Sequence, residues 1–269
     1  MIKPIFNNSV VNHYENDKEE NRLIAGNGKV EFETTVKILN EHLPKKMKIL
    51  DCAAGTGIYA FYLAEMGHEV TALDIVSRHI ELIENELKSK PYSMKTQVND
   101  ARDLSLFEDE SFDAVLCMGP LYHLTEEKDR LQCLSECIRV LKKGGLLFSA
   151  YINRFLVINF LVKNDFKYLK KEFIDNLVTT GVIKSDDPLS FWTDCYFDKP
   201  DIIEETYKSL GLQIIDHAAT DGIPIIFRDK INMMNQDELK VWCDYHYATC
   251  REKSILGISN HGLIIGRKM

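Results

Sequence analysis

Apolar residues in the N-terminal part of the chain recur with the period of a helix. Four of them follow one another at spacings of four, three and four: Phe32, Val36, Leu39 and Leu43. Such spacing places side chains on one face of a helix. Pro44 comes next and cannot continue a helix, so the pattern predicts a helical segment within residues 1–46.

From residue 47 to residue 152, short apolar runs alternate with amphipathic segments. The apolar, often β-branched runs predict strands at 47–53, 69–75, 95–100, 112–118 and 146–152. The segments between them predict a helix over 58–66 that stops at Gly67, a helix from a Ser77 cap to Leu87, and a helix that Thr125 caps. The apolar stripe of the last helix is Leu131, Leu134, Ile138 and Leu141. This alternation indicates right-handed crossovers and a parallel sheet, with any ligand at the carboxyl ends of the strands.

The rest of the chain is expected to complete this sheet. After Asn153 the pattern loosens, until Pro200 opens a helix that Gly211 closes and a strand follows at 212–217. A further helix is predicted from an Asn235 cap with Glu238 at its third position, and its shared face is Leu239, Trp242 and His246. The last strand is expected at 262–266.

These elements together predict an α/β protein. We expect a Rossmann-like, seven-stranded, mostly parallel sheet with helices on both faces. The expected division is an N-terminal helical lid at 1–46, a ligand-binding core at 47–152, a cap insertion at 153–198, a second helical insertion at 224–256, and the remainder of the core sheet at 199–223 and 257–269.

Composition and charge exclude several classes of partner. The formal net charge is −8, so the chain as a whole repels phosphate backbones and nucleic acid is not an expected partner. The lysines of the one basic stretch, 163–171, are interpreted as a solvated helix face. The N-terminus lacks an apolar signal core, and no run of eighteen apolar residues occurs, so we expect a cytoplasmic protein without a membrane partner.

The seven cysteines do not form a recognisable framework in the sequence. They are odd in number and contain no CxxC pair, which is unlike a disulfide or zinc pattern. Cys133 and Cys137 lie one helical turn apart, without another cysteine or a histidine near them in the sequence. They are interpreted as small core residues, and no metal is expected.

The loop from Asp51 to Gly57 is the first feature that points to a ligand. It contains Gly55 and Gly57 and lies between a predicted strand and its helix. Glycine has no Cβ, so a ligand can lie against the backbone, and the helix that follows offers unsatisfied N–H groups. Alone, such a pair of glycines is a weak signal.

The ends of the next two strands strengthen the case for a ligand site. Seventeen residues after Gly57, the second strand ends at Asp74, where a carboxylate can accept hydrogen bonds from both hydroxyls of an adenosine ribose. The third strand ends at Asn99 and Asp100, which places a carboxylate near an adenine amine; Asp103 is the alternative for that position. Three successive strand ends therefore suit one adenosyl ligand.

At this point the chain resembles class I S-adenosylmethionine-dependent methyltransferases. Their first motif, Asp-x-Gly-x-Gly-x-Gly, corresponds to residues 51–57, with Ala53 in place of the first glycine. Residues 112–119 resemble the fourth motif, and residues 122–124 and 139–145 resemble later ones. The segment Gly119 to Leu124 is similar to a group of uncharacterised bacterial methyltransferases. The resemblance covers about a hundred residues and brings no substrate with it.

The resemblance implies S-adenosylmethionine as cofactor and S-adenosylhomocysteine as product. The residues it implies for cofactor binding are Tyr14, Arg22, Asp51, Ala53, Gly55, Gly57, Asp74, Ile75, Asp100, Ala101 and Met118. Two roles stay open: Asp51 either holds the glycine loop or reaches the methionine amine, and Arg22 pairs either with the cofactor carboxylate or with a surface acid.

His123 and Tyr122 are the candidate catalytic residues. A histidine takes up a proton near neutral pH and so can act as a general base. The alternative is that both residues only line the pocket. An aromatic cluster is interpreted either as core or as the wall of an acceptor pocket: Phe191, Trp192, Tyr196 and Phe197.

The expected activity is methyl transfer to a small-molecule acceptor by an in-line displacement, in a monomer or homodimer. The segment from Met118 to Tyr122 lacks the Asn/Asp-Pro-Pro-Tyr motif of methyltransferases that act on planar amino nitrogens. An NAD-dependent oxidoreductase is the first alternative, although Ala60 stands where its third glycine belongs. A non-catalytic adenosyl-binding protein on the same fold is the second.

Overall fold

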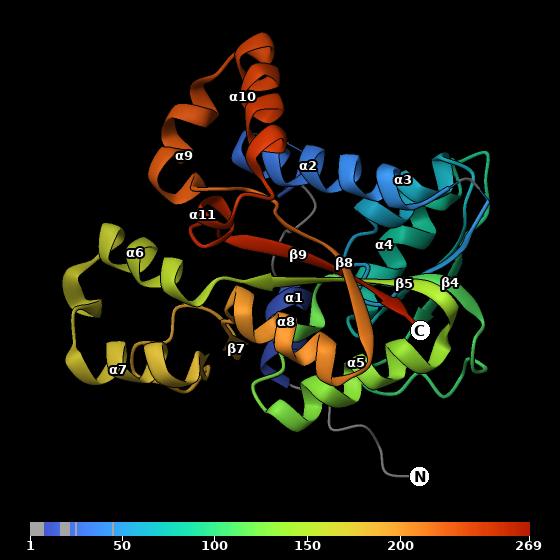
Figure 1. The fold of residues 1–269 in the computed structure, drawn as a ribbon, viewed down its shortest axis with the longest axis horizontal. Coiled ribbons are helices and arrows are strands. Elements are labelled where there is room, and N and C mark those ends of the chain that lie inside the picture. Colours follow the sequence, from blue (N-terminus) through green and yellow to red (C-terminus); the bar gives the residue numbers. More distant parts are fainter. Residues whose placement is uncertain (1–7, 17–21, 25, 45) are drawn as a thin grey trace.

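The computed structural model describes residues 8–16, 22–24, 26–44 and 46–269 (Figure 1). Residues 1–7, 17–21, 25 and 45, which belong to the predicted N-terminal lid, lie outside the described residues. The predicted N-terminal helix is confirmed as α2 (Gly26–His42), in which Val36 and Leu39 are buried. A shorter helix, α1 (Asn8–Asn16), precedes it.

A seven-stranded sheet runs through the middle of the described chain. Its order is β3-β2-β1-β4-β5-β9-β8. The strands are β1 (Lys48–Asp51), β2 (Glu69–Asp74), β3 (Lys95–Val98), β4 (Phe112–Cys117), β5 (Leu141–Ile152), β8 (Leu212–Ala219) and β9 (His261–Lys268). Strands β1 to β5 pair in parallel, and β9 pairs antiparallel with both β5 and β8. The predicted Rossmann-like, mostly parallel sheet is confirmed.

Helices cover both faces of this sheet (Figure 1). One core cluster joins the sheet to α2, α3 (Ile58–Glu65) and α4 (Ser77–Leu87). A second cluster on the other face joins it to α5 (Glu127–Val140) and α8 (Pro200–Ser209). Removing this much apolar surface from water is the main force that holds the layers together.

Two segments extend the sheet domain at the end of β5 and beside β9 (Figure 1). Residues 153–198 contain α6 (Arg154–Asn164), η2 (Phe166–Tyr168), α7 (Lys171–Thr180), β6 (Val182–Ile183) and β7 (Cys195–Tyr196). A short 3₁₀ helix, η1 (Pro120–Tyr122), follows β4. Residues 224–256 contain α9 (Pro224–Met233), α10 (Gln236–Thr249) and α11 (Lys253–Leu256). The predicted capping box of Asn235 and Glu238 is present at the start of α10. None of the helices in the described ranges combines the length and apolar character that crossing a bilayer requires.

Both predicted serine and threonine caps are wrong. Ser77 is the first helical residue of α4, and the preceding turn is held by the carboxylate of Asp74, which accepts from the N–H of Val76 at 2.9 Å. Thr125 stands outside α5, whose N-cap is Glu126. The carbonyls of Thr125 and Leu124 instead accept hydrogen bonds from the guanidinium of Arg130.

The boundaries around β5 also differ from the prediction. The strand begins at Leu141 rather than at residue 146, because Leu141 already pairs with Phe112 before a bulge that contains Gly144 and Gly145. The buried stripe of α5 is rotated accordingly: it consists of Cys133, Leu134, Cys137 and Val140. Leu131 and Ile138 are only half-buried.

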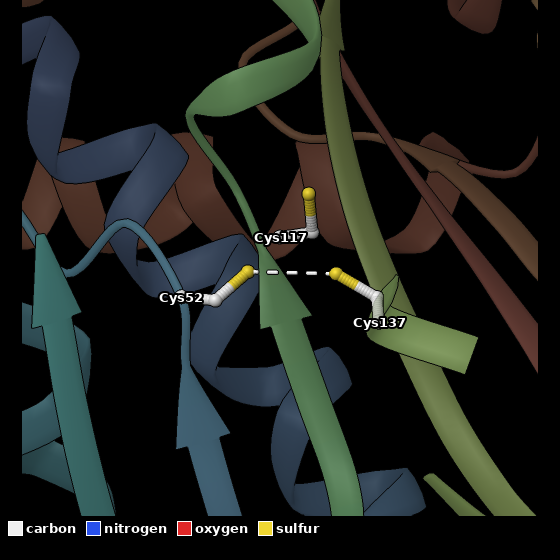
Figure 2. Close-up of side chains that lie close together, drawn as sticks. All are labelled: Cys52, Cys117 and Cys137. Carbon is white, nitrogen blue, oxygen red and sulfur yellow. Dashed lines mark hydrogen bonds between the residues drawn. The ribbon is translucent and has the colours of Figure 1, made fainter. Parts of the chain in front are cut away.

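The cysteines gather in space although they are scattered in the sequence (Figure 2). The Sγ atoms of Cys52 and Cys137 lie 3.6 Å apart, and those of Cys117 and Cys133 lie 3.7 Å apart. Cys133 and Cys137, which have no other cysteine near them in the sequence, acquire cysteine neighbours in the fold because β1 and β4 end over the same stretch of α5. Contact with Cys117 and burial raise the pKa of Cys52 well above its ordinary value. All four are buried in the apolar core, as expected of small core residues.

Gly57 and Gly67 allow a matched test of how the glycine loop is packed. Both have a φ of about +90°, but a Cβ on Gly57 would lie 2.8 Å from Cγ1 of Ile83, whereas nothing lies within 4 Å of one on Gly67. We expect Gly67→Ala to lower the free energy of unfolding by about 1–2 kcal/mol through backbone strain alone. Gly57→Ala should lower it by about 1–3 kcal/mol more, because overpacking adds to that strain.

Urea denaturation of the two variants measures the difference. Equal losses of stability would show that the contact with Ile83 does not restrict position 57.

Candidate active site

A cavity of about 420 Å³ lies at the carboxyl ends of the parallel strands. Most of the residues implied for cofactor binding or catalysis line it: Tyr14, Arg22, Asp51, Ala53, Gly55, Asp74, Ile75, Asp100, Ala101, Met118, Tyr122 and His123. Gly57 is not among the lining residues and packs against α4 instead. The fold therefore brings together residues from the ends of four strands, β1 to β4, and from the N-terminal segment.

Asp74 ties the glycine loop to the end of β2. Its Oδ2 accepts from the N–H of Gly55 at 2.7 Å, and its Oδ1 accepts from the N–H of Val76. Nδ1 of His79, on α4, lies 3.2 Å from Oδ1. A carboxylate has about four lone-pair positions, so Asp74 keeps acceptor capacity toward the cavity.

Asp51 is buried and electrostatically stressed. It is only 2% exposed, and its Oδ2 has no hydrogen-bond partner among the residues that the structure describes. Burial and the neighbouring charge of Asp74 raise the pKa of Asp51 to about 7, against a lowering by the backbone N–H of Ala53. An unsatisfied buried carboxyl of this kind favours a cationic or hydrogen-bonding ligand beside it.

At the third strand end, Asp100 rather than Asp103 faces the cavity. Arg102 donates to Asp100 from Nε at 3.1 Å and from Nη2 at 2.6 Å, and its backbone N–H donates to Oδ1. Asp103 is exposed and accepts from the N–H of Ser105. Arg102 also donates to Asp129 on α5, so the Asp100 carboxylate is tied to that helix.

Ala53, which stands in place of the first motif glycine, packs against Gly119. A Cβ on Gly119 would lie 2.9 Å from Cβ of Ala53, and nothing closer surrounds that position. Because Gly119 lacks a side chain, the loop after β4 makes room for the methyl group of Ala53. Both residues line the cavity together with Met118.

His123 is held neutral in the wall of the cavity. Its Nε2 lies 3.0 Å from the hydroxyl of Tyr14, and its Nδ1 lies 3.3 Å from the carbonyl of Asp194. Burial lowers the pKa of His123 to about 4. Tyr122 donates to the carbonyl of Met118. Both ring nitrogens of His123 are thus engaged and its basicity is low, which favours the interpretation of His123 and Tyr122 as lining residues.

The aromatic cluster divides between wall and core. Phe191, Trp192 and Phe197 line the cavity. Tyr196 is buried behind them, and the guanidinium of Arg130 lies 3.6 Å from the centre of its ring. Trp192 also donates to His13 on α1, so the wall joins the cap segment to the N-terminal helix.

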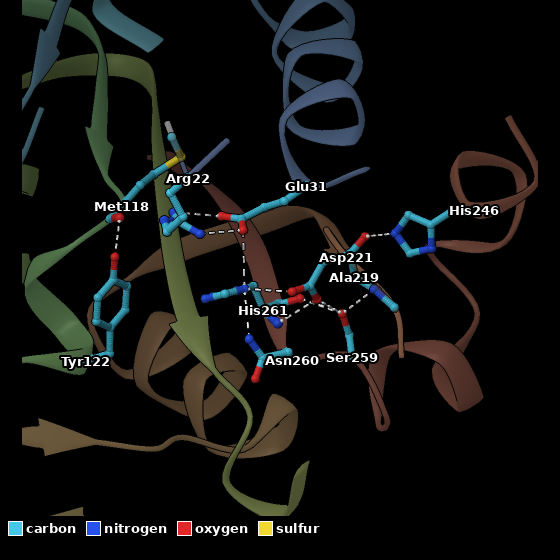
Figure 3. Close-up of polar contacts among 11 residues, drawn as sticks. Arg22, Glu31, Met118, Tyr122, Ala219, Asp221, His246, Ser259, Asn260 and His261 are labelled. Atoms are coloured by element: carbon cyan, nitrogen blue, oxygen red, sulfur yellow. Dashed lines mark hydrogen bonds and ion pairs between the residues drawn. The ribbon is translucent and has the colours of Figure 1, made fainter. Parts of the chain in front are cut away.

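A second polar cluster in the same cavity was not predicted from the sequence (Figure 3). Arg22 donates to both oxygens of Glu31, at 2.7 and 3.2 Å. Nδ1 of His261 lies 2.8 Å from Oδ2 of Asp221 and 3.5 Å from Oε2 of Glu31. The sequence does not reveal this pair, because Asp221 and His261 are forty positions apart. The one signal is a histidine directly before the last predicted strand.

Comparison with known proteins supports the resemblance. Residues 49–145 match the family model described as "Methyltransferase domain". The chain is 29% identical to a glycine/sarcosine N-methyltransferase of Aphanothece halophytica, over 69% of this chain and 72% of that protein. It is 34% identical to a ubiquinone biosynthesis O-methyltransferase of Methylocella silvestris, over 41% of each chain, so it spans less than half of that relative.

A solved structure has the same fold. The crystal structure of a SAM-dependent methyltransferase from Methanosarcina mazei superposes with a TM-score of 0.59 and 20% identity, covering 86% of this chain and 97% of that one. Residues 49–145 therefore match a methyltransferase domain, and the chain has the fold of this SAM-dependent methyltransferase.

Proposed function

We propose that this chain transfers the methyl group of S-adenosylmethionine to a small-molecule acceptor and releases S-adenosylhomocysteine. One observation carries the proposal: a single cavity joins carboxylates from three successive strand ends, Asp51, Asp74 and Asp100, to an aromatic wall. The matched methyltransferase domain contains all three carboxylates.

The described residues fit this cofactor. Asp51 offers an oxygen without a partner, which suits the methionine amine, and Gly55 leaves open space where a side chain would stand. Asp74 keeps lone pairs for the ribose hydroxyls, and Asp100, fixed by Arg102, is directed to the adenine amine. Arg22 lines the cavity and is paired with Glu31. It binds a cofactor carboxylate only if its guanidinium contacts both that carboxylate and Glu31.

When bound, S-adenosylmethionine supplies an activated methyl group with a thioether as its leaving group. The protein then has to align the acceptor and exclude water. Residues 1–46 contribute Tyr14 to the cavity, residues 153–198 contribute Phe191 and Trp192, and residues 224–256 contribute Arg228. We therefore propose the first segment as a lid and the other two as cap insertions that select the acceptor.

The alternatives explain fewer features. A nicotinamide-dependent oxidoreductase needs a third glycine where Ala60 lies buried in α3, and it gives Asp100 no role. A non-catalytic adenosyl-binding protein leaves the aromatic wall unexplained. The relatives' names include both N- and O-methylation, and the net charge of −8 continues to argue against nucleic acid as acceptor.

Calorimetry with S-adenosylmethionine, S-adenosylhomocysteine and NAD tests the cofactor, and a screen of metabolite pools with tritium-labelled S-adenosylmethionine tests the reaction. We expect both adenosyl compounds to bind and NAD not to bind. In Asp74→Ala, the loss of hydrogen bonds to a charged acceptor should weaken S-adenosylmethionine binding by at least about tenfold. Asp103→Ala removes the same charge from an exposed site one strand away and serves as the control.

Binding of NAD without a response to the adenosyl compounds would contradict the proposal. Unchanged affinity in a folded Asp74→Ala variant would contradict the assignment of the ribose site.

Asp51→Asn tests the two interpretations of Asp51. Because its pKa is raised from 3.8 to about 7, the folded protein keeps a proton that the unfolded chain releases, and stability falls as pH rises through this window. The asparagine does not titrate, so its stability relative to wild type should increase between pH 4 and pH 8 by up to about 4 kcal/mol. Thermal melts of both proteins across this range measure the change.

The affinity for S-adenosylmethionine distinguishes the two roles considered for Asp51. If Asp51 holds the methionine amine, wild type should bind S-adenosylmethionine more tightly at pH 8 than at pH 5, and Asp51→Asn should not. The same small pH dependence in both proteins would leave Asp51 with a purely structural role.

Trp192 tests the acceptor wall. Trp192→Leu should lower acceptor turnover at least about tenfold, because a ring that positions the acceptor is lost, while affinity for S-adenosylhomocysteine stays within about twofold. Phe166→Leu, at an exposed aromatic residue of the same cap segment, is the control. Wild-type turnover in a normally folded Trp192→Leu protein would exclude this wall as the acceptor pocket.

A further inference from the structure

His261 and Asp221 lie at the same edge of the sheet as the cofactor loop, but on its other half. Strand β9 runs antiparallel to β5, so its first residue, His261, pairs with Ile152 at the last position of β5. Asp221 follows β8, which also ends at this edge. In the sheet order, β5 separates β9 from β4, so the pair lies beside the end of β5, on the side away from the strands that end in the acidic residues.

Asp221 holds the imidazole of His261 in one orientation. Oδ2 of Asp221 faces Nδ1 of the ring at 2.8 Å, while Oδ1 accepts from the backbone N–H of His261 at 2.9 Å and from the hydroxyl of Ser259 at 2.9 Å. Asp221 is only 3% exposed. A carboxylate fixed by three donors determines both the tautomer and the direction of the ring.

The other ring nitrogen is directed into the cavity. In Figure 3, Nε2 of His261 points away from Asp221, toward the side on which Met118 and Tyr122 lie. His261, Met118 and Tyr122 all line the main cavity, and all three also line a small annex of about 30 Å³. The imidazole therefore faces the space next to the loop after β4.

We propose that His261, oriented by Asp221, is the general base that deprotonates the attacking hydroxyl or amine of the methyl acceptor. This inference rests on the proposed methyl transfer. The acceptor atom passes its proton to Nε2 of His261 and forms a bond to the methyl carbon with its electron pair. The electron pair of the broken carbon–sulfur bond remains on the departing thioether, so charge and atoms balance.

The charges around His261 suit this role. They come from Asp221 after β8, from Glu31 on α2 and from Arg22 before it, and His246 on α10 faces Asp221 in turn. Burial by itself lowers the pKa of His261, but the carboxylates of Glu31 and Asp221 raise it above its ordinary value of 6.5. The imidazolium formed in the reaction is thereby stabilised, and the base form is present only above that pKa.

Two other assignments fit the contacts less well. Ligand atoms of Glu31, Asp221 and His261 lie within 4.8 Å of one another, as in a metal site, but Arg22 already neutralises Glu31 with a bidentate contact and three donors already occupy Asp221. His123, the histidine first considered as a base, has a pKa of about 4 and both ring nitrogens engaged.

The proposal specifies the class of acceptor. Its attacking atom has to carry a proton, as a phenol, an alcohol or a primary or secondary amine does. A tertiary amine or a thioether needs no base and is not expected to depend on His261.

The test compares His261→Gln and Asp221→Asn with wild type. His42→Gln is the matched control, because His42 and Asp216 form a similar pair at 2.9 Å whose histidine is not among the described lining residues of the cavity. Tritium transfer is measured from pH 5.5 to 9 with catechol, glycine and sarcosine and with any acceptor from the metabolite screen. The pKa of His261 is measured by NMR with S-adenosylhomocysteine bound.

We expect His261→Gln to lower kcat/KM at least about 100-fold, and Asp221→Asn to lower it less and to move the acid limb of the pH profile to lower pH. Affinity for S-adenosylhomocysteine should stay within about twofold in both variants, and His42→Gln should resemble wild type. The imidazole should titrate above pH 6.5 in wild type and lower in Asp221→Asn.

Wild-type turnover in His261→Gln overturns the proposal. So does an imidazole that titrates at or below pH 6.5, or one that is unchanged in Asp221→Asn, and this readout needs no acceptor. Failure of the wild-type protein to bind S-adenosylhomocysteine is a different result, because it overturns the proposed function itself.

Discussion

The hydrogen bonds from two backbone N–H groups to the carboxylate of Asp74 organise the half of the cavity that contains the acidic strand ends. One bond joins the end of β2 to Gly55 in the loop after β1, and the other holds the turn into α4 at Val76. Charge-assisted bonds of this kind are strong, and they fix the two loops relative to each other. Burial is the largest cause of the raised pKa of Asp51, and the same arrangement adds the effect of the nearby charge of Asp74.

The other half of the cavity depends on strand direction. In a purely parallel sheet, the first residue of a strand lies at the edge opposite the ligand. Because β9 is antiparallel, its first residue, His261, lies at the ligand edge, and β8 delivers Asp221 to the same place. The single reversed strand of the sheet thus supplies the functional group that the parallel strands do not.

Periodicity and turn residues were sufficient to predict the sheet, its helices and the acidic strand ends, because each of these depends on neighbours in the sequence. The failures depend on side-chain contacts that periodicity does not reveal, some of them between groups that are distant in the sequence. The caps at Ser77 and Thr125 were wrong since Asp74 and Arg130 take over those backbone groups, and the cysteine cluster forms only when β1 and β4 end over α5. Asp221 and His261 carry no motif, so only the pairing of β8 with β9 reveals them.

The two cavity histidines show how the environment assigns different roles to one side chain. His123 and His261 both lose water on burial, which disfavours the imidazolium form. Around His123 the compensating partners are a hydroxyl and a carbonyl, and the pKa falls to about 4. Around His261 two carboxylates outweigh the loss of water, and the pKa rises. A proton that leaves the acceptor in this cavity is therefore stabilised at His261 and not at His123, although the histidine beside the recognisable motif is His123.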